Sequence, residues 1–234
     1  MLGIIFTGGE CPPAGIIRQA LEGEKPLVIA ADSGLAAAEE AGLDPHWITG
    51  DMDSLDDISR LAAYPPERVM RHGHEKDFTD TELAFSLALE KGCGDIWIIG
   101  GGGGRIDHLF AIRSLFEGED SPARWYTARE EIRTVEEGIP LQMSLAAGSM
   151  VSVFPLGEKP WAAESEGLKW PLNGLSWEKG RGGLTASKSG LTTPKSGLGI
   201  SNVATDGSFL IRSVRGRFMV ISQISGSVYG SDCN

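Results

Sequence analysis

Short apolar runs alternate with stretches of helical spacing along the first half of the chain. The apolar runs are each followed by Gly, Asp or polar turn residues, as is typical of buried strands; they cover residues 2–7, 27–31, 47–49 and 96–99. Apolar residues at helical spacing occur at residues 12–21, 35–41, 79–91 and 109–116. This alternation predicts an α/β domain with a mainly parallel sheet and helices on both faces.

The expected helix 79–91 has the most complete sequence signals. Thr79 and Glu82 have the spacing of a capping box, in which each residue satisfies a backbone N–H of the other. Leu83 and Leu87 lie one helical turn apart, and Gly92 is typical of a residue that follows a helix end. We therefore expect a helix whose first turn follows Thr79.

A different pattern begins near residues 117–122. Short strand-like pieces separated by Gly and Pro are typical of an all-β sandwich; they appear at 124–127, 131–135, 141–145, 150–154, 209–214 and 218–222. We expect an α/β domain over residues 1–120 and a β-sandwich domain over residues 121–234. The segment Gly180–Gly199 is rich in Gly, Ser, Thr and Lys and is expected to be a long flexible loop.

The charge balance narrows the classes of ligand. The 234 residues include 21 Lys and Arg against 32 Asp and Glu, which gives a formal net charge of -11. A surface of this sign repels a phosphate backbone, so nucleic-acid binding is not expected. An acidic protein can still bind a nucleotide if divalent cations screen the phosphates, which directs the search to clustered carboxylates.

Cysteine usage and apolar segments bear on the compartment. Cys11, Cys93 and Cys233 are far apart and odd in number, which argues against a disulfide framework or a cysteine-rich zinc site and favours a reducing compartment. The apolar run near Met1 is too short for a signal peptide, and no stretch has the length of a membrane span. We expect a cytoplasmic protein that does not bind membranes.

Acidic residues follow the predicted strands. Ligands of open α/β sheets bind beyond the carboxyl ends of the strands, where Asp32, Asp51 and Asp53 are expected to meet. Asp51 and Asp53 are two residues apart, so in extended backbone both carboxylates face the same way, as a shared magnesium ion requires. The alternative is a strand-end turn in which the Asp side chains accept from nearby backbone amides.

A second acidic cluster lies at the start of the expected helix 79–91. Asp77 or Asp80 would complete a metal site begun by the strand-end carboxylates, and Lys76 would neutralise a phosphate. The alternative is that the acidic residues only stabilise the positive end of the helix dipole. Both interpretations remain open at this level.

Five glycines, Gly100–Gly104, follow the apolar run 96–99 and precede Arg105. Backbone N–H groups of such a run can bind phosphate, and the guanidinium of Arg105 can bind it through two parallel hydrogen bonds. The spacing is not that of a P-loop. A plain flexible turn is the alternative.

Of the six tryptophans, most are expected in the core. Trp170 differs, because it lies in a loop-like segment, GLKWPL, where its ring is available to stack on a flat ligand.

Taken together and in order, six motifs resemble those of the thiamine pyrophosphokinase family over nearly the whole chain. They are ADSG (31–34), DPHWITGDMDS (44–54), EKDFTDTELA (75–84), GGGGGRIDH (100–108), GLKWPL (167–172) and GISN (199–202). The resemblance implies an enzyme that transfers a pyrophosphoryl group from ATP to the hydroxyl of thiamine, with Mg²⁺ as cofactor. It further implies an α/β domain for ATP and Mg²⁺, a β-sandwich that helps to hold thiamine, and a homodimer.

Carried over by motif, the resemblance assigns residues to three roles. The metal ligands and catalytic residues are Asp51, Asp53 and Asp80, with Arg105 as a further catalytic residue. The expected contacts to ATP and its phosphates are Asp32, Lys76, Asp77, Thr79, Gly103, Gly104, Asp107 and His108. The expected contacts to thiamine are Trp170, Ser201 and Asn202.

The mechanism that follows is attack of the thiamine hydroxyl on the β-phosphorus of ATP, with AMP as the leaving group. The sequence does not identify the group that accepts the hydroxyl proton. Two alternatives stay open: another magnesium-dependent phosphotransferase or nucleotide hydrolase, and a non-catalytic nucleotide- or thiamine-binding module.

Overall fold

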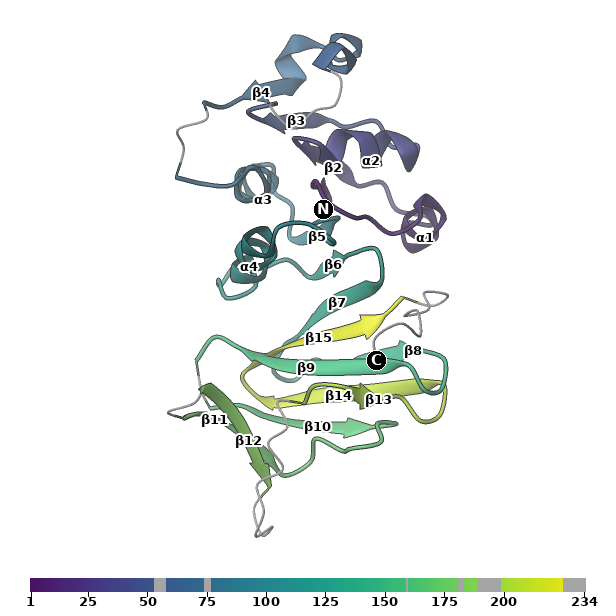
Figure 1. Ribbon diagram of the computed structural model, residues 1–234, viewed down its shortest axis with the longest axis vertical. Helices are drawn as coiled ribbons and strands as arrows, with labels where there is room; N and C mark the ends of the chain where they lie inside the picture. The colour runs from purple at the N-terminus through teal and green to yellow at the C-terminus, as the bar shows by residue number, and fades with distance from the viewer. Residues whose placement is uncertain (53–57, 74–76, 159, 181–182, 189–198, 225–234) are drawn as a thin grey trace. The chain divides into compact units, whose positions relative to one another are not determined.

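The computed structural model describes residues 1–52, 58–73, 77–158, 160–180, 183–188 and 199–224 (Figure 1). Contacts within the chain divide it into two units, Met1–Ala128 (unit 1) and Arg129–Asn234 (unit 2). Among the described residues, no helix combines the length and the apolar character needed to cross a membrane.

Unit 1 is built on a parallel sheet with the order β6-β5-β1-β2-β3-β4. Its strands are β1 (Leu2–Phe6), β2 (Leu27–Ala31), β3 (Trp47–Gly50), β4 (Val69–Arg71), β5 (Asp95–Ile99) and β6 (Arg124–Tyr126). The chain adds β2 to β4 on one side of β1 and then β5 and β6 on the other side. The strand order therefore reverses between β1 and β5, and ligands of open α/β sheets bind beyond the carboxyl ends of the strands at such a point.

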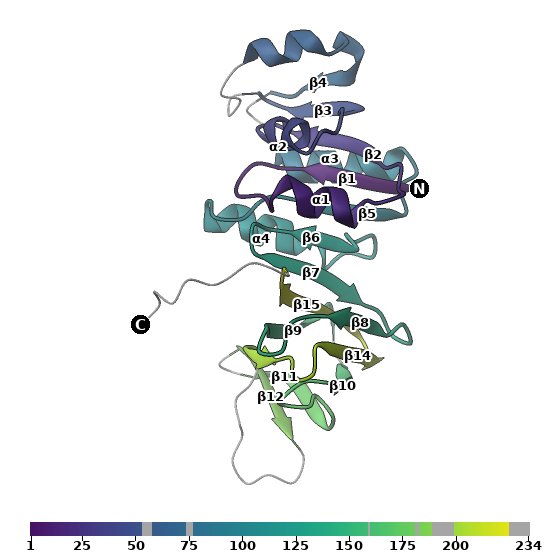
Figure 2. The same cartoon turned by 90° about the vertical axis from the view of Figure 1, so that its right-hand side faces the viewer.

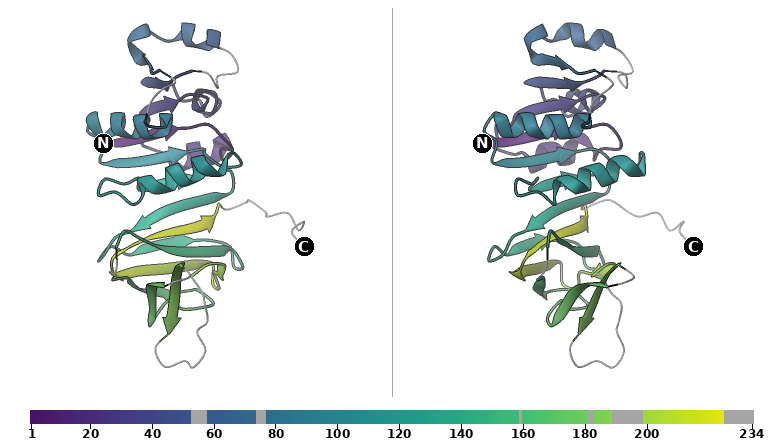
Figure 3. Two further views of the ribbon diagram at one scale, coloured as in Figure 1. Left: turned by 60° about the vertical axis from the view of Figure 1, so that its left-hand side comes forward. Right: turned by 90° about the vertical axis from the view of Figure 1, so that its left-hand side faces the viewer.

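Helices cover both faces of this sheet, as expected. Helices α1 (Ala14–Ala20) and α2 (Gly34–Glu40) lie on the face seen in Figure 2, and α3 (Asp80–Glu90) and α4 (Ile106–Leu115) lie on the opposite face, seen in the right panel of Figure 3. Side chains alternate along β2: Ile29 packs in the cluster with Phe85 of α3, and Ala30 packs in the cluster with Leu35 of α2.

The connection between β3 and α3 contains elements that the sequence pattern did not predict. These are the 3-10 helices η1 (Ile58–Ala63) and η2 (Pro66–Arg68) and the edge strand β4. The side chains of Arg60 and Tyr64 both donate to the carboxylate of Glu39 on α2, the latter at 2.9 Å, and so attach the η1 segment to this helix.

Unit 2 contains two antiparallel sheets with a shared core. One has the order β13-β9-β15-β7 and the other the order β10-β14-β8. The strands are β7 (Glu130–Val135), β8 (Leu141–Ser144), β9 (Met150–Leu156), β10 (Ala162–Glu166), β13 (Asn202–Val203), β14 (Ser208–Arg215) and β15 (Arg217–Gln223). Val153 and Phe218 from the first sheet and Phe209 and Ile211 from the second belong to one buried cluster. The two sheets therefore bury their apolar faces against each other, as in a sandwich.

The structure corrects two expectations about the second half of the chain. The strand expected at 124–127 was counted with the all-β domain, but β6 pairs in parallel with β5 and belongs to unit 1. The flexible loop expected at 180–199 is wrong for its first part, because β11 (Leu175–Gly180) and β12 (Gly183–Lys188) pair as an antiparallel hairpin. Residues 189–198 lie outside the described residues.

Candidate active site

Three carboxylates from separate segments converge in unit 1. Asp32 follows β2, Asp51 follows β3, and Asp80 is the first residue of α3. One carboxylate oxygen of each lies within 4.8 Å of the corresponding oxygens of the other two. Asp32 is buried, and Asp51 and Asp80 are half-buried. The expected convergence of Asp51 and Asp80 at one edge of the sheet is therefore observed.

Backbone conformation brings the strand-end carboxylates together. Asp32 has a left-handed φ of 50°, and its N–H donates to the carbonyl of Thr49 at 2.9 Å, which ties the end of β2 to the end of β3. Gly50 has a φ of 153°, and a Cβ at this position would lie 3.1 Å from the Cβ of Asp32 and 3.2 Å from Oδ1 of Asp80. A residue without a side chain is thus required between the two carboxylates.

Met52, the residue that follows Asp51, is anchored by its buried side chain. Its φ is 66°, a conformation that a long side chain adopts only when its surroundings hold it there. The Met52 side chain is buried in the cluster that includes Leu35 and Leu61. This packing fixes the position of the residue next to Asp51.

Asp80 is held by the start of α3. The expected capping box is confirmed: the Thr79 N–H donates to Oε2 of Glu82 at 2.7 Å, and the Glu82 N–H donates to Oγ1 of Thr79 at 3.2 Å. In addition, the hydroxyls of Thr7 and Thr81 share a buried hydrogen bond of 2.7 Å between the end of β1 and the first turn of α3. The pattern of apolar and polar residues gave no sign of this pair.

The donor set fits a magnesium ion. Magnesium prefers a few carboxylate oxygens at about 2.0–2.1 Å together with waters and phosphate oxygens, so two opposite ligands lie roughly 4.2 Å apart. The 4.8 Å limit for the oxygens of Asp32, Asp51 and Asp80 is close to that separation. Three adjacent carboxylates repel each other, and a divalent cation among them offsets this repulsion. The sequence interpretation assigned Asp32 to the nucleotide, whereas the structure places it within the acidic cluster.

Most of the glycine run is engaged in backbone hydrogen bonds. The amides of Gly100, Gly101 and Gly102 donate to the carbonyls of Tyr126, Gly8 and Glu10 at 2.8, 2.7 and 3.3 Å. Among the described residues, the amides of Gly103 and Gly104 make no such bond. Of the five amides of the run, three thus have backbone acceptors within the described residues, and the run lies at the point where the strand order reverses between β1 and β5.

Close packing explains why this run contains glycine. A Cβ on Gly100 would lie 2.4 Å from the Thr7 carbonyl oxygen, and a Cβ on Gly101 would lie 2.4 Å from Cδ1 of Ile112 on α4. Both positions also have φ values in the left-handed region, 108° and 78°. The plain flexible turn considered from sequence is thus not what the structure shows for these residues.

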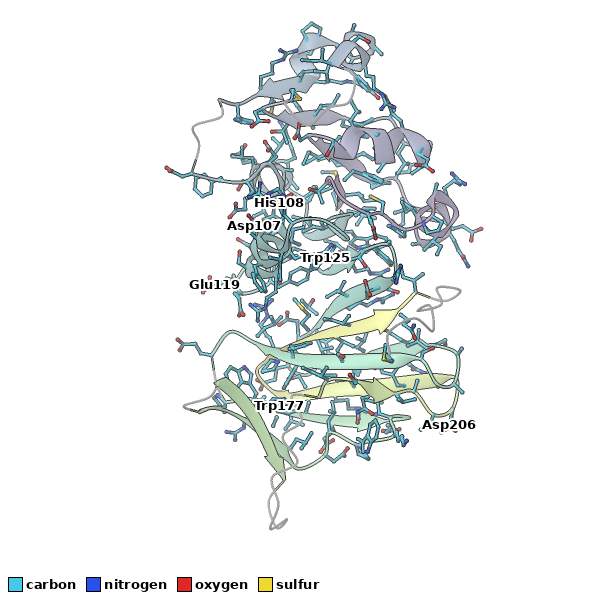
Figure 4. All side chains as sticks on the ribbon, in the orientation of Figure 1. Asp107, His108, Glu119, Trp125, Trp177 and Asp206 are labelled. Atoms are coloured by element: carbon cyan, nitrogen blue, oxygen red, sulfur yellow. The ribbon has the colours of Figure 1, made fainter. Side chains whose placement is uncertain are left out.

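Arg105 and Asp107 form an exposed pair where α4 begins; Figure 4 labels Asp107 and His108. The guanidinium donates to both carboxylate oxygens of Asp107, at 3.1 and 2.5 Å, and the His108 amide donates to Oδ1 at 3.0 Å. The hydrogen bond from Arg105 lowers the pKa of the Asp107 carboxyl, which stays ionised. In this structure the donors of Arg105 are directed to Asp107.

The remaining expected residues of unit 1 are placed less centrally. Asp53 and Lys76 lie outside the described residues. Asp77 is exposed in the bend that precedes α3. Sequence reasoning did not single out Gly50 as a site residue, although a glycine directly between a buried strand and an Asp was a usable signal.

The expected thiamine residues lie together in unit 2. Trp170 is 47% exposed, whereas four other tryptophans are at most 5% exposed, as the sequence led us to expect for most of them. Asn202 is buried, and its side chain contacts the backbone of Trp170. Ser201 is exposed and has a φ of 57°. The GLKWPL and GISN motifs are thus adjacent in space.

Comparison with known proteins relates these features to one family. The model of the thiamin pyrophosphokinase catalytic domain matches residues 19–122. The chain is similar to the thiamine pyrophosphokinase of Bacillus subtilis strain 168, with 31% identity over 164 residues, which cover 64% of this chain and 72% of that protein.

Two solved structures are similar to this chain along nearly its full length. The thiamin pyrophosphokinase of Geobacillus thermodenitrificans is similar with a TM-score of 0.71 and 26% identity, over 97% of this chain and 99% of that chain. The Bacillus subtilis enzyme gives a TM-score of 0.70 and 25% identity, over 96% and 99%. Sequence and fold lead to the same conclusion: the chain belongs to the thiamine pyrophosphokinase family.

Proposed function

We propose that the acidic cluster of Asp32, Asp51 and Asp80 is the centre at which this enzyme transfers a pyrophosphoryl group from ATP to the hydroxyl of thiamine. The reaction follows from membership of the family. The observation that carries the placement is the convergence of the three carboxylates within 4.8 Å at the carboxyl edge of the sheet in unit 1.

The carboxylates are proposed to hold Mg²⁺, with Asp53 as a further ligand on the basis of its sequence position two residues after Asp51. The ion supplies charge neutralisation and orientation of the phosphates. The buried carboxylate of Asp32 and the half-buried Asp51 and Asp80 keep their geometry through the backbone contacts at Gly50 and Thr49. The nucleotide is thereby bound at one fixed orientation relative to the sheet edge.

The glycine run and Arg105 are proposed to bind phosphate oxygens. The amides of Gly103 and Gly104 belong to a loop whose preceding residues are fixed by backbone hydrogen bonds, and backbone amides of this kind can donate to phosphate oxygens. Two phosphate oxygens present the same bidentate geometry to the Arg105 guanidinium as the carboxylate of Asp107 does. Arg105 can therefore exchange Asp107 for phosphate without a change in its bonding pattern. Lys76, Asp77, Thr79 and His108 remain proposed nucleotide contacts.

Pyrophosphoryl transfer depends on positioning and charge neutralisation more than on covalent participation of the protein. The thiamine hydroxyl is proposed to attack the β-phosphorus in line with the departing AMP. Trp170 in unit 2 is proposed to bind an aromatic ring of thiamine through its exposed face. The assignment of ATP to the residues of unit 1 and of thiamine to those of unit 2 is part of this proposal.

Assembly and location are proposals of the same kind. A homodimer is supported by Ile106 and Phe110, which lie one turn apart on α4 and are 66% and 64% exposed. A reducing compartment, the cytoplasm, is supported by the free thiols of Cys11 and Cys93.

The test is a product analysis with the purified full-length chain, ATP, thiamine and Mg²⁺. We expect AMP and thiamine diphosphate in equal amounts, and neither product when Mg²⁺ or thiamine is omitted. Formation of ADP would identify a different phosphotransferase, and AMP formed without thiamine would identify a hydrolase. Binding of both ligands without turnover would identify a binding module.

A further inference from the structure

In unit 2 the start of the GLKWPL segment pairs with residues 203–205, which directly follow the GISN motif. Leu168 pairs with Ala204 as an antiparallel bridge, and the Lys169 amide donates to the Val203 carbonyl at 2.9 Å. The Thr205 amide donates to the Gly167 carbonyl at 2.9 Å. The backbone ladder ends at this point, and Trp170 is the next residue after Lys169.

Beyond the end of this ladder, the side chain of Asn202 binds the backbone of the next residue, Trp170. Its Oδ1 accepts from the Trp170 amide at 3.0 Å, and its Nδ2 donates to the Trp170 carbonyl at 2.6 Å. Oδ1 also accepts from the Val203 amide at 2.9 Å. One buried side chain, 3% exposed, thus binds both backbone polar groups of Trp170, as a neighbouring strand would.

The consequence is that the backbone of Trp170 is held while its ring faces solvent. Trp170 is 47% exposed, and the Lys169 ammonium lies 4.7 Å from the centroid of its ring. An apolar ring of this size is normally buried, and its exposure on a fixed backbone is typical of a contact surface for a ligand. Fixing the backbone reduces the freedom that would be lost when a ligand stacks on the ring.

The position of Asn202 is itself fixed by the preceding turn. Ser201 has a φ of 57°, and its amide donates to Oγ of Ser152 on β9 at 3.1 Å. Gly199 has a φ of 77°, its carbonyl accepts from the Val153 amide at 3.0 Å, and a Cβ on it would lie 2.9 Å from the Val153 carbonyl oxygen. The turn attaches Asn202 to the strand β9, and Asn202 in turn attaches Trp170.

We propose that Asn202 is a positioning residue for the substrate-binding tryptophan: it orients Trp170 for stacking on thiamine and does not contact thiamine itself. This revises the direct contact expected for Asn202 from the family resemblance. The proposal rests on the proposed function, because it assumes that Trp170 binds thiamine.

The test is a double-mutant cycle on the KM for thiamine with the full-length enzyme. Asn202→Ala and Trp170→Ala should each raise this KM about tenfold, because a stacking contact of about 1.4 kcal/mol corresponds to a factor of ten. The double variant should be no worse than Trp170→Ala alone, since a residue that acts through Trp170 has no effect once the ring is gone. The KM for ATP and kcat should remain within about twofold of the wild-type values.

Ser213→Ala is the matched control. Ser213 is a buried polar residue of the same unit whose hydroxyl donates to the Gly216 carbonyl, so its loss removes a buried side chain to backbone bond without touching Trp170. This variant should leave the KM for thiamine unchanged. Asn202→Asp keeps the acceptor for the Trp170 amide but sets a buried carboxylate oxygen against the Trp170 carbonyl, so its KM should be at least as high as that of Asn202→Ala.

The outcomes separate the proposals. A further rise in KM for the double variant would show that Asn202 contacts thiamine and would overturn the positioning role. No effect of Trp170→Ala would overturn both the stacking contact and the role of Asn202. If the wild-type enzyme released no AMP with thiamine, the proposed function itself would fail.

Discussion

Thr7 and Thr81 are 74 positions apart in the sequence, yet their hydroxyls share a buried hydrogen bond of 2.7 Å. The bond links the end of β1 to the first turn of α3, next to Asp80. A residue at the edge of the sheet thereby helps to set the position of a proposed metal ligand.

Thr81→Val should lower both stability and metal-dependent activity. Valine keeps the shape of threonine but leaves the Thr7 hydroxyl buried without this partner, which destabilises by about 1–3 kcal/mol. Urea unfolding measures the loss, and the Mg²⁺ concentration for half-maximal activity should rise. The double variant Thr7→Val/Thr81→Val should be more stable than the single one, because neither hydroxyl is then left buried alone. A double variant less stable than Thr81→Val would contradict the assigned pairing.

Replacing any one of the three clustered carboxylates by an amide should reduce kcat/KM by at least about a hundredfold. Each replacement removes a negative charge that is proposed to hold the metal ion, and the ion neutralises the phosphates. The variants are Asp32→Asn, Asp51→Asn and Asp80→Asn. The same variants should weaken Mn²⁺ binding in a calorimetric titration of the protein without nucleotide. Asp32→Asn decides whether this residue belongs with the metal ligands.

Asp44→Asn serves as the control for the carboxylate series. Asp44 forms an exposed ion pair with Arg68 at 3.1 Å, and such a contact contributes about 0–1 kcal/mol to the free energy of unfolding. Wild-type kinetics are expected for this variant. Full activity of Asp32→Asn alongside Asp44→Asn would remove Asp32 from the proposed metal site.

Gly50→Ala should reduce activity more than the same substitution at another glycine with a positive φ. Its Cβ would lie 3.2 Å from Oδ1 of Asp80 and 3.1 Å from the Cβ of Asp32, so the carboxylates must move. Gly42→Ala is the matched variant: its φ is 75°, but no atom lies within 4 Å of the added Cβ. Both changes should destabilise by about 1–2 kcal/mol through backbone strain. Only Gly50→Ala should also raise the Mg²⁺ requirement; equal requirements in both variants would count against the close packing at Gly50.

Cys11 should react slowly with iodoacetamide at neutral pH. Burial, followed by the charge of Glu40, raises the pKa of the Cys11 thiol to about 11 from 9.0. The thiolate fraction, and with it the alkylation rate, should rise about tenfold per pH unit up to pH ~11. Because the folded state holds the proton more tightly, the stability contribution of this group is complete below pH 9.0 and is lost as the pH rises to about 11.

Peptide mass spectrometry after timed alkylation measures this rate for Cys11 separately from the other cysteines. The same peptide in urea provides the reference, where the rate should level off near pH 9. A rate in the native enzyme equal to that in urea at pH 8 would show that the thiol is not buried.

The sequence was sufficient for the part of the site that depends on strand order. A strand followed by Asp51 and a capped helix beginning at Asp80 placed both carboxylates at one edge, because the carboxyl ends of parallel strands lie together. It also placed Asp32 at this edge, but it assigned Asp32 to the nucleotide and not to the metal site. The close approach of Asp32 to the other two carboxylates depends on its left-handed backbone and on the missing side chain of Gly50, which are set by tertiary contacts.

Physical reasons also explain why the sequence pattern did not predict some elements of unit 2. Strand β10, Ala162–Glu166, buries only Ala163 and Ser165, small or polar residues that give a weak alternation of hydrophobicity. The hairpin of β11 and β12 was hidden by a composition rich in Gly, Ser, Thr and Lys, which is typical of loops. Pairing with a neighbouring strand, rather than strong local preference, accounts for both.

The hydrogen bonds between Glu10 and Gly102 have a consequence for the energetics of nucleotide capture. They order the glycine run before any phosphate arrives, through the Glu10 amide to the Gly102 carbonyl at 2.7 Å and the reverse bond at 3.3 Å. A free run of glycines would lose about 1–2 kcal/mol of conformational entropy per residue on becoming ordered. In a preorganised loop that loss is incurred during folding, so more of the intrinsic interaction with phosphate is expressed as affinity.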